Sequence, residues 1–268
     1  MRRPPARFYG QQPAKEVLPI ETKVIDISSH QKSVDFAKDK ASGVTGVIIR
    51  AGYTGYGAKH KMYKDDWFES HYKGATEAGL DVGAYFYSCA LSEAFAEKEA
   101  NYFLSLLEGK RFSLPVYMDV EESHSTTDMP ALGREKLTAV VKKWCETVEN
   151  AGYFTGFYTM KSWCGTYLDM KALSRFTFWL AHWAKETDYS GAYGMWQYSS
   201  EGSVPGVSGN VDLDRCYRDF PAIIRAEGLN GYGAARYTVE AAGLTKSQSV
   251  RAAEALRSAG FTPVVKEE

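Results

Sequence analysis

The stretch GVIIRAG at residues 46–52 is apolar almost throughout, and VGAYFYS at residues 82–88 repeats the pattern. Continuously apolar runs are typical of strands buried on both faces, whereas a half-exposed strand alternates apolar and polar residues. Further strand candidates follow the same signs, at residues 24–28, 114–121, 154–160, 176–183, 193–199 and 207–214. The sequence therefore predicts eight strands, several of them covered on both sides.

Helical stretches lie between these strands, at residues 62–78, 92–107 and 133–150. In the last of them, apolar residues from Leu137 to Val148 recur at intervals of three and four, as on one face of a helix. The alternation predicts an α/β fold, a modified (β/α)8-type barrel with shortened or missing helices. A doubly wound open sheet is the competing topology, but no glycine-rich phosphate motif follows a strand to support it.

The N-terminal extension, residues 1–21, is basic and proline-containing. It lacks the apolar run of a secretory signal, so we expect synthesis in a cytoplasm without a signal peptide. No window approaches the ~20 apolar residues that span a bilayer, so no membrane insertion is expected. The barrel is then expected to occupy residues 22–227.

The C-terminal part of the chain has a different pattern. Residues 228–235 are glycine-rich and predict a linker. Residues 236–268 predict a small β-α-β unit, with strands at 236–241 and 261–265 and a helix at 245–259. Such a unit is too small to fold alone, so it must dock on the barrel or pair with a copy of itself.

Composition excludes several classes of protein. The 32 Lys and Arg residues are balanced by 33 Asp and Glu, which argues against nucleic acid as a partner. The aromatic share of 14%, with 18 Tyr and 6 Trp, suits sugar rings but also fills ordinary cores. The 4 Cys are widely separated and predict free thiols, and neither they nor the 5 His show metal-site spacing. We therefore expect no metal and no other cofactor.

Carboxylates at strand ends carry the main chemical signal. Asp26 ends the first strand, Asp119 and Glu121 end the fourth, and Asp212 and Asp214 lie in the last. The two acids of the D-x-E pair point to one face of the strand, and such ends converge at the mouth of a barrel. Glycoside hydrolysis needs one protonated and one ionised carboxyl group, and crowding separates their pKa values. The same cluster could instead bind Mg²⁺ or Ca²⁺.

Six segments in order make the chemistry more specific: DISSHQ, RAGYTG, VGAYFYS, VYMDVEE, WLAHW and MWQYSSEGSVPGVSGNVDLD. Together they resemble family 25 of the glycoside hydrolases, the muramidase lysozymes of bacteria and phages, over about residues 24–220. The resemblance implies a modified barrel that cleaves the β-1,4 bond after N-acetylmuramic acid in peptidoglycan. Because the N-terminus shows no signal, the phage endolysin type is favoured, acting on the bacterial cell wall after release.

The resemblance also assigns roles by position. It makes Glu121 the general acid/base, with Asp26, Asp119 and Asp212 as the accompanying catalytic carboxylates. Asp214 stands where the family usually has Asn, so it is left out of this set. The resemblance favours net retention through the 2-acetamido group of the substrate, with direct attack by a carboxylate as the alternative.

Six residues are expected to bind substrate, namely Tyr53, Tyr85, Tyr158, Trp179, Gln197 and Arg50. About half of the aromatic residues at strand ends should instead belong to the core, because successive residues of a strand point to opposite faces. Arg50 lies in a buried-looking strand and is expected to pair with one of the carboxylates, since an unpaired buried charge is costly.

The tail resembles half of a sporulation-related repeat domain, a module that binds peptidoglycan. Half of such a domain leaves strand edges unpaired, so we expect a homodimer through residues 236–268. An alternative to the enzyme is a catalytically weak glycan-binding barrel that the tail targets or assembles.

Overall fold

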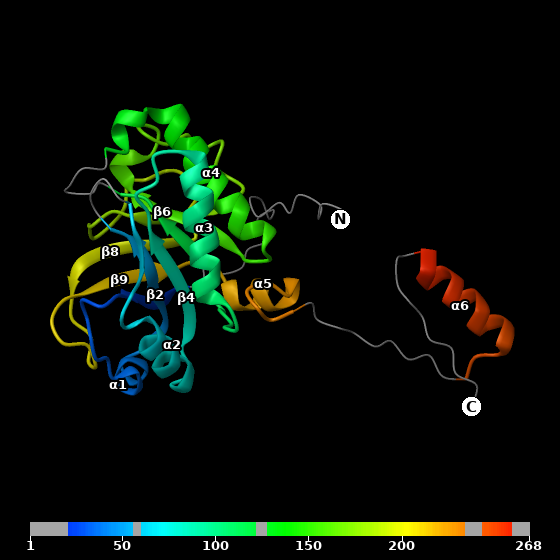
Figure 1. The fold of residues 1–268 in the computed structure, drawn as a ribbon. Helices are drawn as coiled ribbons and strands as arrows, with labels where there is room; N and C mark the ends of the chain where they lie inside the picture. Colours follow the sequence, from blue (N-terminus) through cyan, green and yellow to red (C-terminus); the bar gives the residue numbers. More distant parts are fainter. Residues whose placement is uncertain (1–20, 56–59, 122–127, 234–242, 259–268) are drawn as a thin grey trace. The chain divides into compact units, whose positions relative to one another are not determined.

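The computed structural model describes residues 21–55, 60–121, 128–233 and 243–258 (Figure 1). The chain divides into two units, Met1–Ala235 and Arg236–Glu268, which are described separately.

The first unit is built on a barrel of eight strands, which closes because β1 pairs with β2. Around the barrel the order is β1-β9-β8-β7-β6-β5-β4-β2, and the short β3 pairs with the end of β2 outside the ring. The strands are β1 Thr22–Ile27, β2 Val44–Thr54, β3 Met62–Lys64, β4 Asp81–Tyr87, β5 Val116–Asp119, β6 Thr155–Met160, β7 Thr177–Ala181, β8 Met195–Gly202 and β9 Val211–Cys216. The predicted modified barrel is confirmed.

β9 runs against its neighbours, whereas the other strands of the ring are parallel. The turn between β8 and β9 includes Gly206 and Gly209, whose φ angles of 112° and 83° favour glycine. Because β9 is antiparallel, its beginning lies at the same end of the barrel as the carboxyl ends of the parallel strands. Asp212, the second residue of β9, is thereby placed at that end.

Helices cover only part of the barrel (Figure 1). The two longest, α3 and α4, pack against each other and against β2 and β6 respectively. The connection from β6 to β7 has a single 3₁₀ turn at Lys161–Trp163 in place of a long helix. The helices of the first unit are α1 Phe36–Ala41, α2 Phe68–Glu77, α3 Glu93–Leu107, α4 Arg134–Asn150 and α5 Phe220–Glu227, with a further 3₁₀ turn at Pro130–Leu132.

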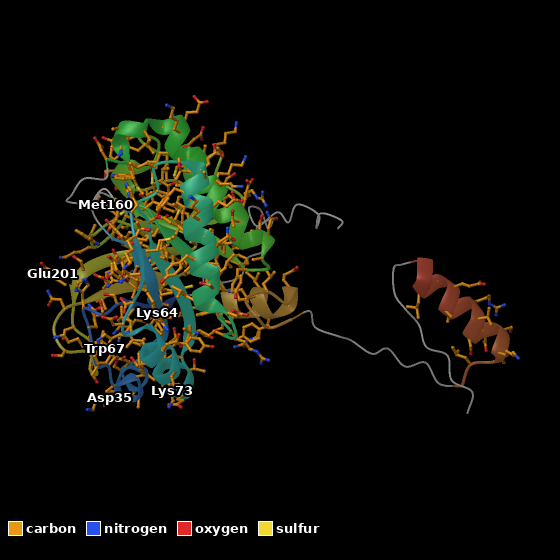
Figure 2. All side chains as sticks on the ribbon, in the orientation of Figure 1. Asp35, Lys64, Trp67, Lys73, Met160 and Glu201 are labelled. Atoms are coloured by element: carbon orange, nitrogen blue, oxygen red, sulfur yellow. The ribbon has the colours of Figure 1, made fainter. Side chains whose placement is uncertain are left out.

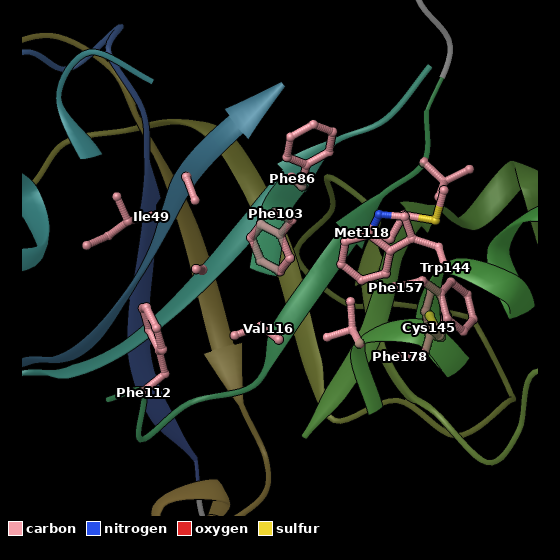
Figure 3. Close-up of a cluster of buried hydrophobic side chains, with 14 of the residues drawn as sticks. Ile49, Phe86, Phe103, Phe112, Val116, Met118, Trp144, Cys145, Phe157 and Phe178 are labelled. Atoms are coloured by element: carbon pink, nitrogen blue, oxygen red, sulfur yellow. The ribbon is translucent and has the colours of Figure 1, made fainter. Parts of the chain in front are cut away.

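The main hydrophobic core lies between these helices and the strands (Figure 3). Phe103 of α3 packs on Trp144 of α4, with ring centroids 5.3 Å apart, and on Phe86 of β4. Phe157 and Phe178 stack across β6 and β7. The continuously apolar strands are thus covered by helix side chains on their outer face, as their sequences predict. All four cysteines are free thiols, and three of them are buried.

Two boundaries differ from the sequence prediction. The helix expected at residues 62–78 is wrong in its first turns, because Met62–Lys64 form β3 and α2 begins at Phe68. Tyr63 of β3 stacks on Tyr53 of β2, and this pairing outweighs local helix propensity. The strand expected at 207–214 begins at Val211, after the glycine turn.

The second unit contains the helix α6, Lys246–Ser258, within the range predicted for it. Gln248 accepts a hydrogen bond from the backbone N–H of Thr245 at 2.8 Å, which is half of the predicted capping box. The two predicted strands of this unit lie outside the described residues. Over the described part of the chain, no helix is long and apolar enough to cross a membrane.

A buried carboxyl group joins α3 to the barrel. Glu99 of α3 is 0% exposed and accepts hydrogen bonds from Thr54 at the end of β2 and from Ser88 and Cys89 after β4. Burial raises its pKa to about 7. Glu99 therefore fixes two strand ends near the mouth of the barrel.

Replacing Glu99 with Ala is expected to lower the free energy of unfolding by about 2–4 kcal/mol, because three buried donors lose their acceptor. Urea denaturation measures the change. Glu97→Ala on the same helix is the control, since its carboxylate makes only a half-exposed ion pair with Lys143 and should contribute less than about 1 kcal/mol. Equal losses in the two variants would contradict this role for Glu99.

Candidate active site

Four carboxyl groups meet at the mouth of the barrel. Asp26 comes from β1, Asp119 ends β5, Glu121 follows two residues later, and Asp212 begins β9. All four line one cavity of about 200 Å³. The other residues around this cavity are Tyr85, Tyr158, Trp179, Trp183 and Gln197.

A second cavity of about 510 Å³ continues from the first. The two share five lining residues, namely the four carboxylates and Tyr85. The second cavity adds Ser28, Ser29, His30, Gln31, Arg50, Tyr53 and Tyr87 among its lining residues. The carboxylates therefore lie where two halves of a groove meet, and all ten residues predicted to form the site line one half or both.

A hydrogen-bond network fixes the first cavity. The Tyr158 hydroxyl donates to Oε1 of Gln197 at 2.9 Å, and Nε2 of Gln197 donates to Oδ2 of Asp26 at 2.8 Å. The indole N–H of Trp183 donates to the same Oε1 at 3.0 Å. These three contacts define the orientation of the Gln197 amide and hold one oxygen of Asp26 in place.

Burial gives Glu121 the properties of an acid near neutral pH. It raises the pKa of Glu121 to about 7, and the charge of Asp212 acts in the same direction. The pKa of Asp119 is also raised, first by burial and then by the charge of Glu121, while Arg50 acts in the opposite direction. Burial and Asp212, rather than the adjacent Asp119, are thus what raise the pKa of Glu121.

Asp26 and Asp212 lie directly opposite each other on β1 and β9. Burial raises the pKa of Asp212 to about 6, and hydrogen bonding to Asp26 limits the rise. Burial and the charges of Asp212 and Asp214 raise the pKa of Asp26. Burial thus raises the pKa values of both Asp212 and Glu121, to about 6 and about 7.

Asp214 lies beneath the cavity and lines neither half of the groove. It is 0% exposed, and its Oδ1 accepts a hydrogen bond from the indole N–H of Trp179 at 2.7 Å. Burial raises the pKa of Asp214 to about 8, so near neutral pH it is mainly a neutral acid. A neutral acid resembles Asn in shape and charge, which accounts for Asp at a position where the resemblance expects Asn.

Replacing Asp214 with Asn is therefore expected to stabilise the protein as the pH rises. A carboxyl group whose pKa is raised on folding stabilises the protein fully below its unfolded pKa near 4. This contribution is lost as the pH rises toward its folded pKa of about 8. Asn does not titrate, so its advantage over the wild type should grow between pH 5 and pH 8, by on the order of 1–3 kcal/mol. Thermal unfolding across this range measures the difference.

Asp188→Asn is the control with the opposite sign. A hydrogen bond from Lys161 lowers the pKa of the exposed Asp188, so its replacement should lose stability as the pH rises through the acid range. An advantage of Asp214→Asn that stays flat with pH would show that Asp214 is not a buried neutral acid.

Arg50 pairs with a carboxylate that the sequence did not single out. Its Nε donates to Oδ2 of Asp65 at 2.8 Å and its Nη2 to the Ser29 hydroxyl at 2.8 Å. The expected partner in the catalytic cluster is therefore wrong, although Asp119 still interacts electrostatically with Arg50. The guanidinium also lies 5.1 Å from the ring centroid of Tyr53, so Arg50 and Tyr53 form one wall of the larger cavity.

The aromatic residues divide by depth. Trp179 and Tyr158 are 2% and 5% exposed and form the floor of the smaller cavity. Trp183 is 58% exposed and stands at its rim, yet it is missing from the six residues predicted to bind substrate. Its place in WLAHW, two residues beyond the end of β7, is the signal that could have found it.

Outside the four carboxylates the groove offers little to hold a cation. Across residues 21–55, 60–121, 128–233 and 243–258, no group of three or more His, Cys, Asp or Glu has the arrangement of a metal site. The arrangement instead combines a protonated acid, neighbouring carboxylates and aromatic walls, which suits acid catalysis on a sugar.

Comparison with known proteins agrees with this chemistry. Residues 25–207 match the model of a family described as glycosyl hydrolases family 25. The autolytic lysozyme of Clostridium acetobutylicum is 31% identical over 195 residues, which are 72% of this chain and 55% of that protein. Lysozyme M1 of Streptomyces globisporus is 31% identical over 208 residues, 71% of this chain and 66% of that protein. The chain thus spans about half to two thirds of the length of these relatives.

Solved structures show the same fold. The bacterial lysozyme from Streptomyces coelicolor has a TM-score of 0.63 at 26% identity, covering 79% of this chain and 98% of that one. The modular autolysin LytC from Streptococcus pneumoniae, in complex with a synthetic peptidoglycan ligand, has a TM-score of 0.65 at 26% identity, covering 74% of this chain and 47% of that one.

Proposed function

The chain belongs to family 25 of the glycosyl hydrolases, and we propose that it is a muramidase acting on bacterial peptidoglycan. The bond cleaved is the β-1,4 linkage between N-acetylmuramic acid and N-acetylglucosamine. The observation that carries this proposal is the meeting of Asp26, Asp119, Glu121 and Asp212 in one cavity walled by aromatic side chains. Burial raises the pKa of Glu121 to about 7 and so keeps one member of this cluster protonated near neutral pH, as acid-assisted glycoside cleavage requires.

Glu121 is the general acid/base in this proposal. It gives its proton to the glycosidic oxygen as the bond to the anomeric carbon breaks, and the N-acetylglucosamine side leaves as an alcohol. Its carboxylate then takes a proton from water in the second step. Burial of Glu121 supports the first step because it keeps the group protonated near neutral pH.

The carbonyl oxygen of the 2-acetamido group attacks the anomeric carbon and forms an oxazolinium ring. Asp119 accepts the acetamido N–H, and the charge of Arg50, which lowers the pKa of Asp119 against the effect of burial, favours the ionised form that balances the positive charge developing there. Asp26 and Asp212 are the neighbouring carboxyl groups. Water then opens the ring, and the configuration at the anomeric carbon is retained. The cavity of about 200 Å³ between Asp119, Tyr158 and Gln197 offers a confined, polar place for the acetamido group.

Inhibition separates this route from attack by a carboxylate. A thiazoline analogue of N-acetylmuramic acid mimics the ring intermediate and is expected to inhibit competitively. A 2-fluoro sugar, which accumulates a covalent glycosyl-enzyme where a carboxylate attacks the anomeric carbon, is expected to form no covalent adduct with this protein. A trapped adduct on an aspartate would overturn the acetamido route and leave the muramidase assignment in place.

The alternative of a catalytically weak binding protein is tested on purified peptidoglycan. The muramidase is expected to reduce the turbidity of a suspension and to release new reducing ends, whereas a binding protein would sediment with the walls and release nothing. The endolysin type and the cytoplasmic synthesis stay predictions from the sequence.

We propose that residues 236–268 form a separate unit that dimerises the protein and assists binding to the wall. Exposed apolar side chains support this, with Leu244 at 39%, Val250 at 49% and Leu256 at 36% exposure. Light scattering of the full chain and of a chain ending at Ala235, where the first unit ends, tests the dimer. A monomeric full-length protein would contradict it.

A further inference from the structure

A third cavity of about 670 Å³ lies beside the groove, and we call it the outer pocket. Its lining residues are Trp183, Ala184, Lys185, Tyr198, Ser199, Ser200, Glu201 and Arg215. Of these, Trp183 is the one that also lines the catalytic cavity. The indole ring of Trp183 therefore separates the outer pocket from the carboxylates.

Strand alternation places the outer pocket on the far side of the barrel wall. Gln197 of β8 faces the catalytic cavity, so its neighbours Trp196 and Tyr198 face outward. Arg215 lies opposite Trp196 on β9 and faces outward with it. Glu201 lies on the same strand, toward the outer margin of the barrel (Figure 2).

Trp183 is built as a fixed wall. Its side chain is 58% exposed, which is unusual for an indole, yet its N–H is held by Gln197 of the catalytic network. An exposed aromatic face held in one orientation is a surface on which a sugar ring or an apolar part of a ligand can pack.

The lining of the outer pocket carries two cations and one acid. The Arg215 guanidinium lies 4.8 Å from the ring centroid of Tyr198 and 5.5 Å from that of Trp196, so aromatic rings hold it in place. Its carboxylate contact with Glu21 is long, at 3.6 Å, and both side chains are more than a third exposed. Among the described residues, Lys185 has no carboxylate within ion-pair distance. With Lys185 and Arg215 as cations and Glu201 as the acid, the lining of the outer pocket has an excess of positive charge for an anionic ligand.

We propose that the outer pocket binds the peptide stem of a muramic acid residue through the carboxylates of that stem. This inference rests on the proposed function, because a pocket that shares a wall with the catalytic cavity receives groups attached within a sugar or two of the cleaved bond. N-acetylglucosamine is uncharged, and on an unsubstituted glycan strand the peptide stems carry the carboxylates. Arg215 and Lys185 fit such groups by charge, and Trp183 fits the sugar or the methyl groups beside them.

Two substrates test the assignment. One is a preparation of glycan strands with peptide stems. The other is the same preparation after an amidase has removed the stems and the lactyl carboxylate that this hydrolysis exposes on each muramic acid has been coupled to methylamine. Phosphate polymers are first removed from both. The readout is the ratio of kcat/KM on the stem-bearing strands to kcat/KM on the stem-free strands. Arg215→Gln and Lys185→Gln are each expected to lower this ratio about threefold to tenfold, and the double variant to lower it further.

Matched controls carry the same chemical changes elsewhere. Arg134 makes an ion pair of the same 3.6 Å length with Asp169, and Lys142 is an exposed lysine of α4. Arg134→Gln and Lys142→Gln are expected to leave the ratio unchanged. Melting temperatures close to the wild type confirm that all variants are folded, and Lys185→Gln tests the proposal even if Arg215→Gln does not fold.

The failure of this proposal is distinct from that of the proposed function. If the wild type cleaves neither substrate, the muramidase assignment is wrong. If the wild type is active and the Arg215 and Lys185 variants lose activity equally on both substrates, or on neither, the stem assignment is wrong. An effect confined to walls that keep their phosphate polymers would show that phosphate is the anion bound, and would also overturn it.

Discussion

Replacing Glu121 with Gln is expected to reduce kcat on peptidoglycan by about 10²–10⁴-fold, the range typical of losing a general acid. Gln fills nearly the same volume but has no proton to give to the leaving oxygen. The fold should persist, because Glu121 lies beyond the end of β5 and makes none of the barrel's strand pairs. Reducing-end release from purified walls measures the loss.

Glu77→Gln on the exposed surface of α2 is the control and should match the wild type. The pH profile adds an independent check on the same residue. Because the acid must be protonated, wild-type kcat should fall as the pH rises through about 7, the pKa of Glu121. If the Glu121→Gln variant clears walls as well as the wild type does, Glu121 is not the acid.

Replacing Asp119 with Asn is expected to reduce kcat by about 10²–10³-fold, as for other groups that stabilise charge in the transition state. Asn can still accept the acetamido N–H through its carbonyl oxygen, but it cannot balance the positive charge of the oxazolinium ring. Asp119 is 7% exposed, and one of its oxygens has no hydrogen-bond partner among the described residues. That oxygen is a buried acceptor that the described part of the chain leaves unsatisfied. Steady-state rates on stem-bearing glycan strands measure the effect.

Asp66→Asn, on an exposed carboxylate after β3, is the control for this variant. The loss at Asp119 should appear mainly in kcat, because the charge develops only as the ring forms. A change confined to KM would mean that Asp119 binds the ground state alone, and the acetamido route would lose its orienting group.

The sequence predicts much of the fold because burial leaves a direct pattern. Runs such as residues 46–52 are apolar apart from Arg50, and the barrel places both faces of these strands against other side chains. The meeting of Asp26, Asp119, Glu121 and Asp212 was also predictable, since all four stand at or near the ends of strands. The antiparallel direction of β9 was not predictable, because the direction of a strand depends on the segment that connects it to the preceding strand and not on the strand's own residues.

Other features depend on contacts between distant segments. The strand at Met62–Lys64 forms through pairing with β2, which a local helix pattern conceals. Asp65 forms an ion pair with Arg50 because β3 turns back beside β2. The spacing of the two residues in the sequence does not predict this ion pair. The fixed orientation of Trp183 comes from Gln197, a residue of the next strand. Sequence patterns report burial and strand ends well, but they do not report individual side-chain pairs, such as Arg50 with Asp65, that form because distant segments lie side by side.

The bond that is cleaved is the central claim, and mass analysis of the released muropeptides tests it most directly. After digestion of purified peptidoglycan, reduction with borohydride marks the sugar at each new reducing end. The muramidase proposed here is expected to yield fragments that end in reduced N-acetylmuramic acid, and the Glu121→Gln variant none. Fragments that end in reduced N-acetylglucosamine would contradict the assignment and place the activity in another class of glycan hydrolase.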